Sequence, residues 1–531
     1  MPQYECPNVK SIDIEFQKVK CTFSRFTGLR SKKKQILHGV SGLFKSGELT
    51  AVMGPSGSGK TTLLNTLTGF QRNFEGKIIY RTESDELSWQ TFKKYSRYIQ
   101  QEDALFAFFT VQETMSFAAE LKMDRNLDRR TKQKIMDEVL NSLDLIKTKE
   151  TACGNLSGGQ RKRFSIALEL INNPLVIFLD EPTTGLDIVA AMKCATVLKN
   201  LAKKNRTIVC TIHQPSTAIY ELFDHVYLIA EGRSVYQGDP MQIVSFFGNA
   251  GLICPKYHNP ADYAMEVMCN EYGNFNKRLA AAQDSSWRKN VKIIEEERMK
   301  TFSINSPSEL RQAAIITKRC LISIMPATLK FPLELHIIRK EHLNGWYKIR
   351  TYYVCFIIIH LIVQITFSIL FLGILYVMTS QPPEWHRFFM FVIIITLGSL
   401  IGEGIGLNFG ILLSPLAGTF AATTVGMINI PFCGFFILFS HMSPFMYHVS
   451  KLMFSSYCME GLLHAIYGFN REKLYCPDDQ DICFFRYPKI LLLEIGLKEE
   501  QMFLDAAILT GHVVLLFILA YIFLKMKVSS I

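Results

Sequence analysis

A run of eight residues, Gly54-Pro-Ser-Gly-Ser-Gly-Lys-Thr61, has the composition and spacing of a phosphate-binding loop. Glycines allow backbone N–H groups to curl around phosphate oxygens, and the start of a following helix adds partial positive charge. Lys60 is expected to reach the β- and γ-phosphates, while the Thr61 hydroxyl is expected to bind Mg²⁺. The residues predicted to bind a nucleotide here are Gly54, Pro55, Ser56, Gly57, Ser58, Gly59, Lys60, Thr61 and Thr62.

Two neighbouring carboxylates, Asp180 and Glu181, follow the apolar run 175–179. Such near-continuous apolar runs are typical of strands in a parallel sheet that is covered on both faces. Asp180 is expected to orient Mg²⁺, and Glu181 is expected to poise the attacking water. Together with the phosphate-binding loop, these residues predict hydrolysis of ATP with Mg²⁺ as the cofactor.

Between these two motifs lies Leu156-Ser-Gly-Gly-Gln-Arg-Lys-Arg163, and here the sequence resembles the ABC ATPase family. The resemblance implies that Ser157 and Gly159 contact the γ-phosphate of an ATP held by a partner subunit, which closes a head-to-tail dimer. By the same resemblance, the signature segment and the loop Thr184-Gly-Leu-Asp187 add these residues to the nucleotide site: Ser157, Gly158, Gly159, Gln160 and Asp187.

Two further positions match functional residues of that family. Gln101 matches the glutamine that links Mg²⁺ to the membrane domain, with Gln100 beside it as an alternative, and His213 matches the histidine that senses the γ-phosphate. The resemblance therefore implies as catalytic residues Glu181, His213 and Gln101, and as Mg²⁺-binding residues Thr61, Gln101 and Asp180. The aromatic side chain that stacks on adenine is left open among Phe16, Phe23 and Phe26.

The elements around these motifs define the expected fold class, an α/β P-loop NTPase (ABC ATPase) domain followed by an all-α polytopic membrane domain. The apolar strand Leu49–Met53 leads into the phosphate-binding loop, and a helical run, Thr61–Leu67, leads out of it. We expect the nucleotide-binding domain over residues 1–275, a linker with an amphipathic helix over 276–330 and the membrane domain over 331–531. The linker helix would lie on the cytoplasmic leaflet or pack on the soluble domain, with its apolar face formed by Leu310, Ala313, Ala314, Thr317 and Leu321.

Four apolar runs in the second half reach the ~20 residues needed to cross a bilayer. They cover about Tyr352–Val377, Phe388–Leu413, Leu416–Phe439 and Phe503–Leu524. Basic residues before the first run and after the last one predict an integral, multi-pass membrane protein with both termini in the cytoplasm. A less regular apolar stretch, about 442–469, is expected only to re-enter the membrane.

Ionisable residues inside these runs are candidate functional sites, because an unpaired charge in the bilayer is costly. Glu403 is the clearest case and should face the protein interior or a water-filled path. His360, Gln364 and His512 are weaker cases that could simply pair between helices.

The overall composition is consistent with this membrane assignment. The chain has 531 residues and a formal net charge of +11, which we attribute to basic residues beside a membrane rather than to nucleic-acid binding. The N-terminus is too polar for a signal peptide. Of the 13 cysteines, Cys476 and Cys483 lie in a polar stretch between apolar segments, where a disulfide is plausible if that stretch faces outward.

The order of one nucleotide domain followed by one membrane domain resembles the White-type subfamily G half-transporters of the ABC superfamily. The strings that carry this resemblance are Tyr257-His-Asn-Pro-Ala-Asp-Tyr-Ala-Met-Glu266, Phe331-Pro-Leu-Glu334, Arg339-Lys-Glu-His342, Asn344-Gly345 and Met378-Thr-Ser-Gln381. It implies a homodimer, or a heterodimer with another subfamily G half-transporter, in the plasma membrane or an intracellular membrane. The sterol- and lipid-exporting branch is the closest, and the pigment-precursor branch comes second.

Members of that subfamily carry six spans, and two of them lie between the linker helix and the Phe331-Pro-Leu-Glu334 segment. Here Leu321-Ile-Ser-Ile-Met325 runs directly into Pro326, and no apolar run of spanning length fits between them. Two interpretations follow: an ATP-driven exporter of lipid or another hydrophobic solute, or a truncated isoform that binds ATP and a partner without transporting. The apolar runs exclude a soluble ABC protein that acts on nucleic acid.

Overall fold

The computed structural model describes residues 10–529, apart from residues 28–29, 72, 84, 125–126, 257, 292–298, 301–308, 323–326, 380, 382–383, 474–486 and 498–500. The chain divides into two compact units. The first, called here the N-terminal unit, comprises residues up to Ser308 together with Lys340–Trp346. The second, the helical unit, comprises Glu309–Arg339 and Tyr347–Ser530. The predicted Cys476–Cys483 disulfide lies outside the described residues.

The core of the N-terminal unit is a six-stranded sheet in the order β10-β9-β3-β8-β7-β6. All neighbours are parallel except β9 and β10. β3, β7 and β8 are wholly buried, as their apolar sequences predict for a sheet covered on both faces. The strands of this sheet are β3 (Leu49–Met53), β6 (Ser96–Ile99), β7 (Val176–Leu179), β8 (Thr207–Ile212), β9 (His225–Ala230) and β10 (Arg233–Gly238).

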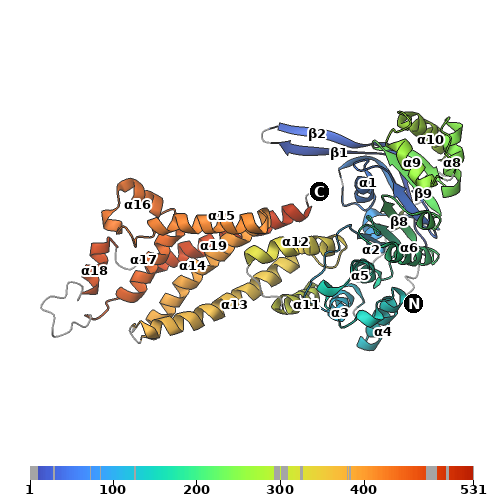
Figure 1. Ribbon diagram of the computed structural model, residues 1–531. Helices are drawn as coiled ribbons and strands as arrows, with labels where there is room; N and C mark the ends of the chain where they lie inside the picture. The colour runs from blue at the N-terminus through green and yellow to red at the C-terminus, as the bar shows by residue number, and fades with distance from the viewer. Residues whose placement is uncertain are drawn as a thin grey trace. The chain divides into compact units, whose positions relative to one another are not determined.

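A second sheet, largely antiparallel, has the order β11-β5-β4-β1-β2. Its strands are β1 (Asp13–Thr27), β2 (Arg30–Phe44), β4 (Phe74–Arg81), β5 (Glu86–Leu87) and β11 (Met299–Lys300). β1 and β2 form the long two-stranded arm seen in Figure 1. Where the two sheets meet, Phe16 packs against Phe44 and Tyr227 at ring-centroid distances of 5.2 and 5.7 Å, so aromatic side chains tie the sheets together.

Helices cover the six-stranded sheet and carry several of the predicted site residues at their N-termini. Those of the N-terminal unit are α1 (Lys60–Leu67), α2 (Trp89–Tyr95), α3 (Val111–Lys122), α4 (Arg129–Ser142), α5 (Gly158–Leu170), α6 (Ile188–Ala202), α7 (Thr217–Tyr220), α8 (Ile243–Asn249), α9 (Pro260–Met268) and α10 (Asn276–Val291).

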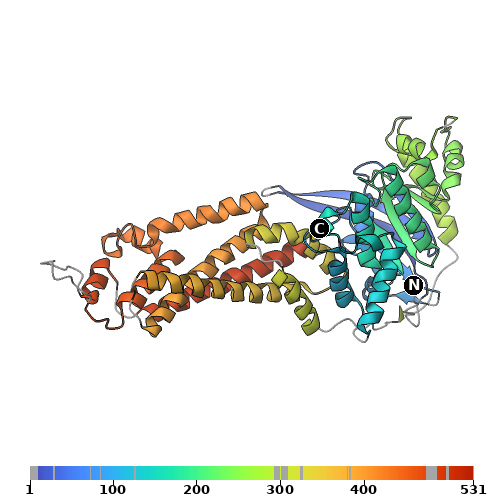
Figure 2. The same cartoon turned by 60° about the horizontal axis from the view of Figure 1, so that its bottom comes forward.

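In the described part of the helical unit, three helices are long and apolar enough to cross a membrane: α13, α14 and α19. α14 contacts both α13 and α19, and the helices run alongside one another in Figures 1 and 2. The helices of this part of the chain are α11 (Glu309–Ile322), α12 (Ala327–Leu343), α13 (Ile349–Met378), α14 (Trp385–Leu412), α15 (Pro415–Asn429), α16 (Pro444–Ser450), α17 (Phe454–Tyr467), α18 (Pro488–Ile495) and α19 (Met502–Ser529).

The third predicted span differs from its expected form. The sequence predicts one continuous run over Leu416–Phe439, but α15 ends at Asn429 and a 3₁₀ turn, Ile430–Phe432, follows it. Pro431 lies in that turn, and a proline cannot donate the backbone hydrogen bond that an α-helix needs. The 15 residues of α15 rise about 22 Å, less than the ~30 Å of a hydrocarbon core.

The amphipathic linker helix also differs, in the face that it buries. α11 packs along α13, with Ile315 and Ile316 buried, whereas Leu310 is 86% exposed. The expected apolar face began at Leu310. Ile315 and Ile316 interrupt the expected polar side of the helix. They are larger than Ala313 and Ala314 of the expected apolar face, so their burial removes more apolar area from water.

Candidate functional site

The parallel order of β3, β8, β7 and β6 brings four loops to one edge of the sheet. Each predicted catalytic segment follows the carboxyl end of one of these strands: the phosphate-binding loop follows β3, Gln101 follows β6, Asp180 follows β7 and His213 follows β8. In open α/β sheets, ligands bind in the crevice outside the carboxyl ends of the strands. The sheet therefore assembles residues that are up to 159 positions apart in the sequence.

The phosphate-binding loop depends on two glycines in conformations that other residues avoid. Gly54 has φ +157°, and a Cβ added there would lie 2.0 Å from the backbone oxygen of Ile229. Gly59, immediately before α1, has φ +107°. These conformations keep the loop tight and aim backbone N–H groups towards the start of α1, where an anion is favoured.

Lys60 lies folded against the loop that it belongs to. Its Nζ donates hydrogen bonds to the backbone oxygens of Gly54 at 2.7 Å and Pro55 at 3.0 Å. Burial lowers the pKa of Lys60, while the nearby carboxylates of Glu181 and Asp180 act in the opposite direction. An incoming phosphate would offer this ammonium a stronger acceptor than two carbonyl oxygens.

Asp180 and Thr61 supply oxygen atoms suited to Mg²⁺. The Thr61 hydroxyl donates to Asp180 Oδ1 at 3.3 Å, and the Thr211 hydroxyl donates to the same oxygen at 2.5 Å. Mg²⁺ is usually bound through one or two carboxylates together with substrate phosphates. A hydroxyl and a carboxylate side by side at the start of α1 fit that ion, and Thr61 and Asp180 would hold it together with the phosphates of ATP.

Glu181 is held by two neutral side chains. Gln101 Nε2 and the Thr184 hydroxyl each donate to Glu181 Oε2 at 3.0 Å. The backbone oxygens of Gln100 and Gln101 both accept from Lys162 Nζ, at 3.3 and 2.9 Å, so the two residues differ in the side-chain contact of Gln101 with Glu181. The structure thus brings Gln101 to the carboxylate that is expected to poise water.

The backbone at Glu181 is itself in an uncommon conformation. Its φ is +47°, which is rare for a residue other than glycine. The Glu181 N–H donates to Thr211 Oγ1 at 2.8 Å, which helps to hold this conformation. Such strain is often found where a side chain must be aimed for function.

His213 reaches the phosphate-binding loop from the end of β8. Its Nε2 lies 3.2 Å from the Ser56 hydroxyl. This contact places the ring beside the loop that would hold the phosphates of ATP. A histidine here can respond to the γ-phosphate through a hydrogen bond.

The signature residues form a second group, at the start of α5. Ser157 caps this helix, and its side chain and that of Gln160 form a reciprocal capping box. Asp187 caps α6 with a single hydrogen bond, which its side chain accepts from Ala190 N at 3.3 Å. A Cβ on Gly159 would lie 2.9 Å from the Cβ of Ala190, so the signature segment and the start of α6 are packed together.

The adenine-stacking candidates can now be narrowed. Phe16 is fully buried between the two sheets and has no surface to offer to a base. Phe23 is only partly buried and packs against the same core. The side chain of Phe26 lies outside the described residues, so the choice between Phe23 and Phe26 stays open.

Two residues of the site, Thr211 and Tyr98, have roles that depend on tertiary contacts and that the sequence pattern does not indicate. Thr211 bridges Asp180 and the backbone of Glu181, and Tyr98 lies with its hydroxyl 3.3 Å from Asp180 Oδ2. Neither residue type indicates phosphate chemistry. Their place in the sequence could have marked both residues, because each lies in a strand that ends next to a predicted motif.

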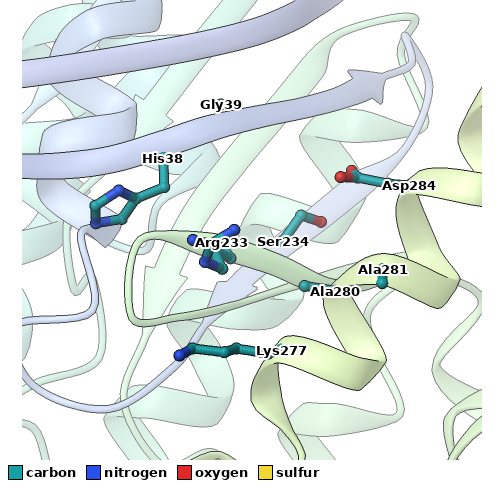
Figure 3. A pocket seen from close by; sticks show the side chains of 8 residues that line it. All are labelled: His38, Gly39, Arg233, Ser234, Lys277, Ala280, Ala281 and Asp284. Atoms are coloured by element: carbon teal, nitrogen blue, oxygen red, sulfur yellow. The ribbon is translucent and has the colours of Figure 1, made fainter.

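A small pocket of about 120 Å³ lies elsewhere in the N-terminal unit (Figure 3). Its lining residues are His38, Gly39, Arg233, Ser234, Lys277, Ala280, Ala281 and Asp284. None of them is a predicted site residue, and they come from β2, β10 and α10 rather than from the loops at the sheet edge. The pocket is therefore separate from the candidate nucleotide site.

Within the helical unit, the structure brings together two ionisable residues that the sequence marks. His360 of α13 and Glu403 of α14 lie with Nδ1 and Oε1 2.7 Å apart, and both side chains are about 14% exposed or less. His512 instead makes a local contact, from Nδ1 to the Ile508 backbone oxygen at 2.9 Å. Glu403 thus has a hydrogen-bonding partner on a neighbouring helix.

Comparisons with known proteins match both parts of the chain. Residues 37–184 match a family model described as ABC transporter, while residues 312–467 and 213–282 match two models described as ABC-2 type transporter. The chain is 27% identical over 618 residues to ABC transporter G family member 21 of Arabidopsis thaliana, covering 98% of this chain and 91% of that protein. It is 37% identical over 272 residues to Protein scarlet of Drosophila melanogaster, covering 50% and 40% respectively.

Among solved structures, an ATP-binding cassette of an ABC transporter in its ADP conformation aligns with 22% identity and a TM-score of 0.38. The alignment covers 44% of this chain and 95% of that one.

Proposed function

We propose that this chain is an ATP-driven half-transporter of ABC subfamily G, and that its dimer moves a lipid, a sterol or another hydrophobic solute across a membrane. The observation that carries the ATP-driven part is the arrangement at the sheet edge, where Glu181 is held by Gln101 beside Asp180 and the phosphate-binding loop. Mg²⁺, bound by Thr61 and Asp180, would stabilise charge on the phosphates.

In this proposal, Glu181 acts as the general base for the water that attacks the γ-phosphate. Gln101 and Thr184 donate to one of its oxygens, which leaves the other free to accept a proton from that water. His213 contacts the γ-phosphate from the opposite loop. Ser157 and Gly159 act on the ATP of the partner subunit, so that two nucleotides close the dimer.

A hydrophobic solute is supported by the membrane helices. Glu403 and His360, two ionisable residues that the sequence marks within the predicted spans, lie within hydrogen-bonding distance of each other. The segments Phe331-Pro-Leu-Glu334 and Arg339-Lys-Glu-His342 resemble the lipid-exporting branch most closely.

Reconstitution in vesicles tests this function. The purified chain should move a fluorescent sterol or phospholipid between leaflets when ATP and Mg²⁺ are supplied. Glu181→Gln should lower ATP hydrolysis by about 10²–10⁴-fold, because it removes the general base, and should stop the flux. ATP hydrolysis that depends on Glu181 without flux of any lipid tested would contradict the lipid-export proposal.

A second candidate is a truncated isoform that binds ATP and a partner subunit without transporting. The alignment with family member 21 extends over 618 residues, although this chain has only 531, so that relative carries internal residues that this chain lacks. The sequence between α11 and α12 has no room for the two missing spans. Sequencing the genomic region between the codons for Met325 and Pro326 would test this, since an exon encoding two apolar helices there favours truncation.

A further inference from the structure

Tyr98 makes a contact that the nucleotide chemistry above does not use. It lies in β6, is 3% exposed, and its hydroxyl donates to Asp180 Oδ2 at 3.3 Å. The other oxygen, Oδ1, accepts from Thr211 and Thr61.

The backbone of Tyr98 is fixed by a residue that is 246 positions away. The Asn344 side-chain amide donates from Nδ2 to Tyr98 O at 3.0 Å and accepts at Oδ1 from Tyr98 N at 3.1 Å. Asn344 is 6% exposed, so these hydrogen bonds are shielded from water. The ring of Phe70 packs edge-on against the Tyr98 ring at 4.9 Å, which limits the tilt of the phenol.

The segment that carries Asn344 has a second anchor on the same unit. The indole N–H of Trp346 donates to Glu169 Oε1 at 3.3 Å, and Lys122 Nζ lies 4.1 Å from the centre of the indole ring. Trp346 does not contact Tyr98 through either interaction. It therefore offers a natural control for effects that come from loosening the segment as a whole.

We infer that Tyr98 is a positioning residue for the metal-binding carboxylate Asp180, and that the amide of Asn344 sets the position of Tyr98. The carboxylate of Asp180 can rotate about its side-chain bonds. Its orientation is fixed only while both oxygens accept hydrogen bonds. Mg²⁺ demands near-ideal octahedral geometry, so a rotated carboxylate binds it poorly. Partners that orient a metal ligand typically contribute 10–100-fold to metal affinity.

This inference rests on the proposed role of Asp180 in binding Mg²⁺. It goes beyond that role because it links the metal site to residues 340–346, which are covalently continuous with α12 and α13. A displacement of Asn344 would move the peptide of Tyr98 directly, since both of its hydrogen-bonding groups are engaged.

Nucleotide binding with and without metal tests the inference on the full-length chain in detergent or nanodiscs. The probe is a fluorescent ATP analogue, titrated once in excess Mg²⁺ and once in EDTA. Tyr98→Phe should reduce the Mg²⁺-dependent gain in affinity about tenfold, because only the hydroxyl is lost. The affinity in EDTA should stay unchanged, since the phosphate-binding loop is untouched.

Two matched variants separate this effect from ordinary loss of packing. Tyr80→Phe removes another buried phenol, which donates to Leu67 O at 3.0 Å and does not contact Asp180, so it should leave the Mg²⁺-dependent gain intact. Asn344→Ala should reproduce the effect of Tyr98→Phe, whereas Trp346→Phe should not. The double variant of Tyr98 and Asn344 should be no worse than Tyr98→Phe alone, because both changes act on one contact.

The possible outcomes distinguish the positioning role of Tyr98 from the Mg²⁺-binding role of Asp180, on which it rests. If Asp180→Asn leaves the Mg²⁺-dependent gain unchanged, the metal role of Asp180 is wrong. If Asp180→Asn abolishes the gain but Tyr98→Phe retains it, the positioning role of Tyr98 is overturned. An equal loss of affinity in Mg²⁺ and in EDTA would also overturn it, because that pattern indicates a distorted loop.

Discussion

At the scale of single residues, this site depends on neutral hydroxyl groups as much as on its charged side chains. Thr211 lies fully buried in β8 and contacts both carboxylate positions: its hydroxyl donates to Asp180 and accepts from the N–H of Glu181. It therefore couples the rare backbone conformation at Glu181 to the orientation of Asp180.

Replacing Thr211 with Val should separate the contribution of the hydroxyl's hydrogen bonds from the contribution of side-chain packing. Valine has nearly the same volume but no hydroxyl, so Asp180 and the Glu181 N–H would each lose a buried partner. We expect a loss of stability of about 1.5–3 kcal/mol, the usual contribution of a hydrogen bond to a charged group. ATP hydrolysis should fall as well, measured alongside thermal unfolding of the purified chain.

The matched control is Thr211→Ser, which keeps the hydroxyl and should retain most of the activity. If the Val and Ser variants behave alike, the hydroxyl has no such role and the methyl group is the important part.

At the scale of elements, the start of α1 shows how one strained position creates a binding surface. The left-handed conformation of Gly59 lets the chain turn sharply from the loop into the helix, so that helix N–H groups face the crevice. A Cβ at this position would lie 2.9 Å from the end of the flexible Leu37 side chain, so the steric clash can relax. The main cost of a side chain is therefore the backbone conformation.

Gly59→Ala should destabilise the N-terminal unit by roughly 1–2 kcal/mol, the cost of holding a non-glycine residue in a left-handed conformation. Affinity for ATP should fall at least tenfold, because the N–H groups that bind phosphate would shift. Equilibrium binding of ATP and the melting temperature would measure both effects.

Gly248→Ala serves as the comparison, since Gly248 in α8 has open space around its Cβ position and an ordinary φ. That change should be neutral or slightly stabilising. Equal damage from both variants would argue against a special role for the conformation at Gly59.

A second element-scale feature is a buried arginine at the start of α14. Arg387 is 3% exposed and caps the end of α17: Nη1 donates to Ala465 O in the last turn at 3.3 Å and to Gly468 O just beyond it at 2.9 Å, and Nη2 donates to Phe469 O at 3.3 Å. Its Nε donates to Glu384 Oε2 at 2.8 Å. One guanidinium thus satisfies carbonyl groups that a helix end leaves without partners.

Arg387→Met should destabilise the helical unit by about 3 kcal/mol or more, because several buried carbonyl groups would lose their donor at once. Heating followed by size-exclusion chromatography would reveal this as a lower aggregation temperature. Arg387→Lys should fail to restore stability, since an ammonium lacks the planar fork that reaches these carbonyl groups.

The neighbouring His386, whose side chain is 61% exposed, provides the control through His386→Ala. A comparable loss in that variant would indicate a general sensitivity of this turn rather than the cap.

At the scale of the whole molecule, one chain carries only half of each expected ATP site. In the proposed head-to-tail dimer, the phosphate-binding loop and the signature segment of one ATP site would come from different chains, so each site would be shared. ABC subfamily G half-transporters dimerise, and on the proposed function the partner would be a second copy or a related chain.

Mixing two inactive variants tests for a homodimer. Lys60→Met should disable the phosphate-binding loop, and Ser157→Arg should disable the signature segment. A dimer of one chain of each kind has one site with both defects and one intact site. Differently tagged chains, co-purified and assayed for trapped nucleotide, should therefore regain about half of the wild-type occupancy.

Neither variant should trap nucleotide when it is expressed alone. If the mixed dimer forms but stays empty, the two segments do not meet head to tail. If no mixed dimer forms, the natural partner is a different chain.

The sequence alone determined the nucleotide chemistry, because that chemistry depends on local spacing. A phosphate-binding loop, a carboxylate pair after an apolar strand and a signature segment each fit within a few residues, and the structure places them in the elements that the sequence predicts. The choice of Gln101 over Gln100 needed the structure, because both side chains fit the pattern and only one reaches Glu181.

Only the tertiary structure decided which distant residues act together. Asn344 and Tyr98, or His360 and Glu403, are ordinary side chains until packing brings them within hydrogen-bonding distance. The structure also shows that Phe16 is too buried to stack on adenine and that α15 ends at Asn429, before it could span a membrane. In α11 it buries Ile315 and Ile316 rather than the expected apolar face. The physical reason is the same in each case: burial and long-range pairing are properties of the folded chain, and a local pattern does not encode them.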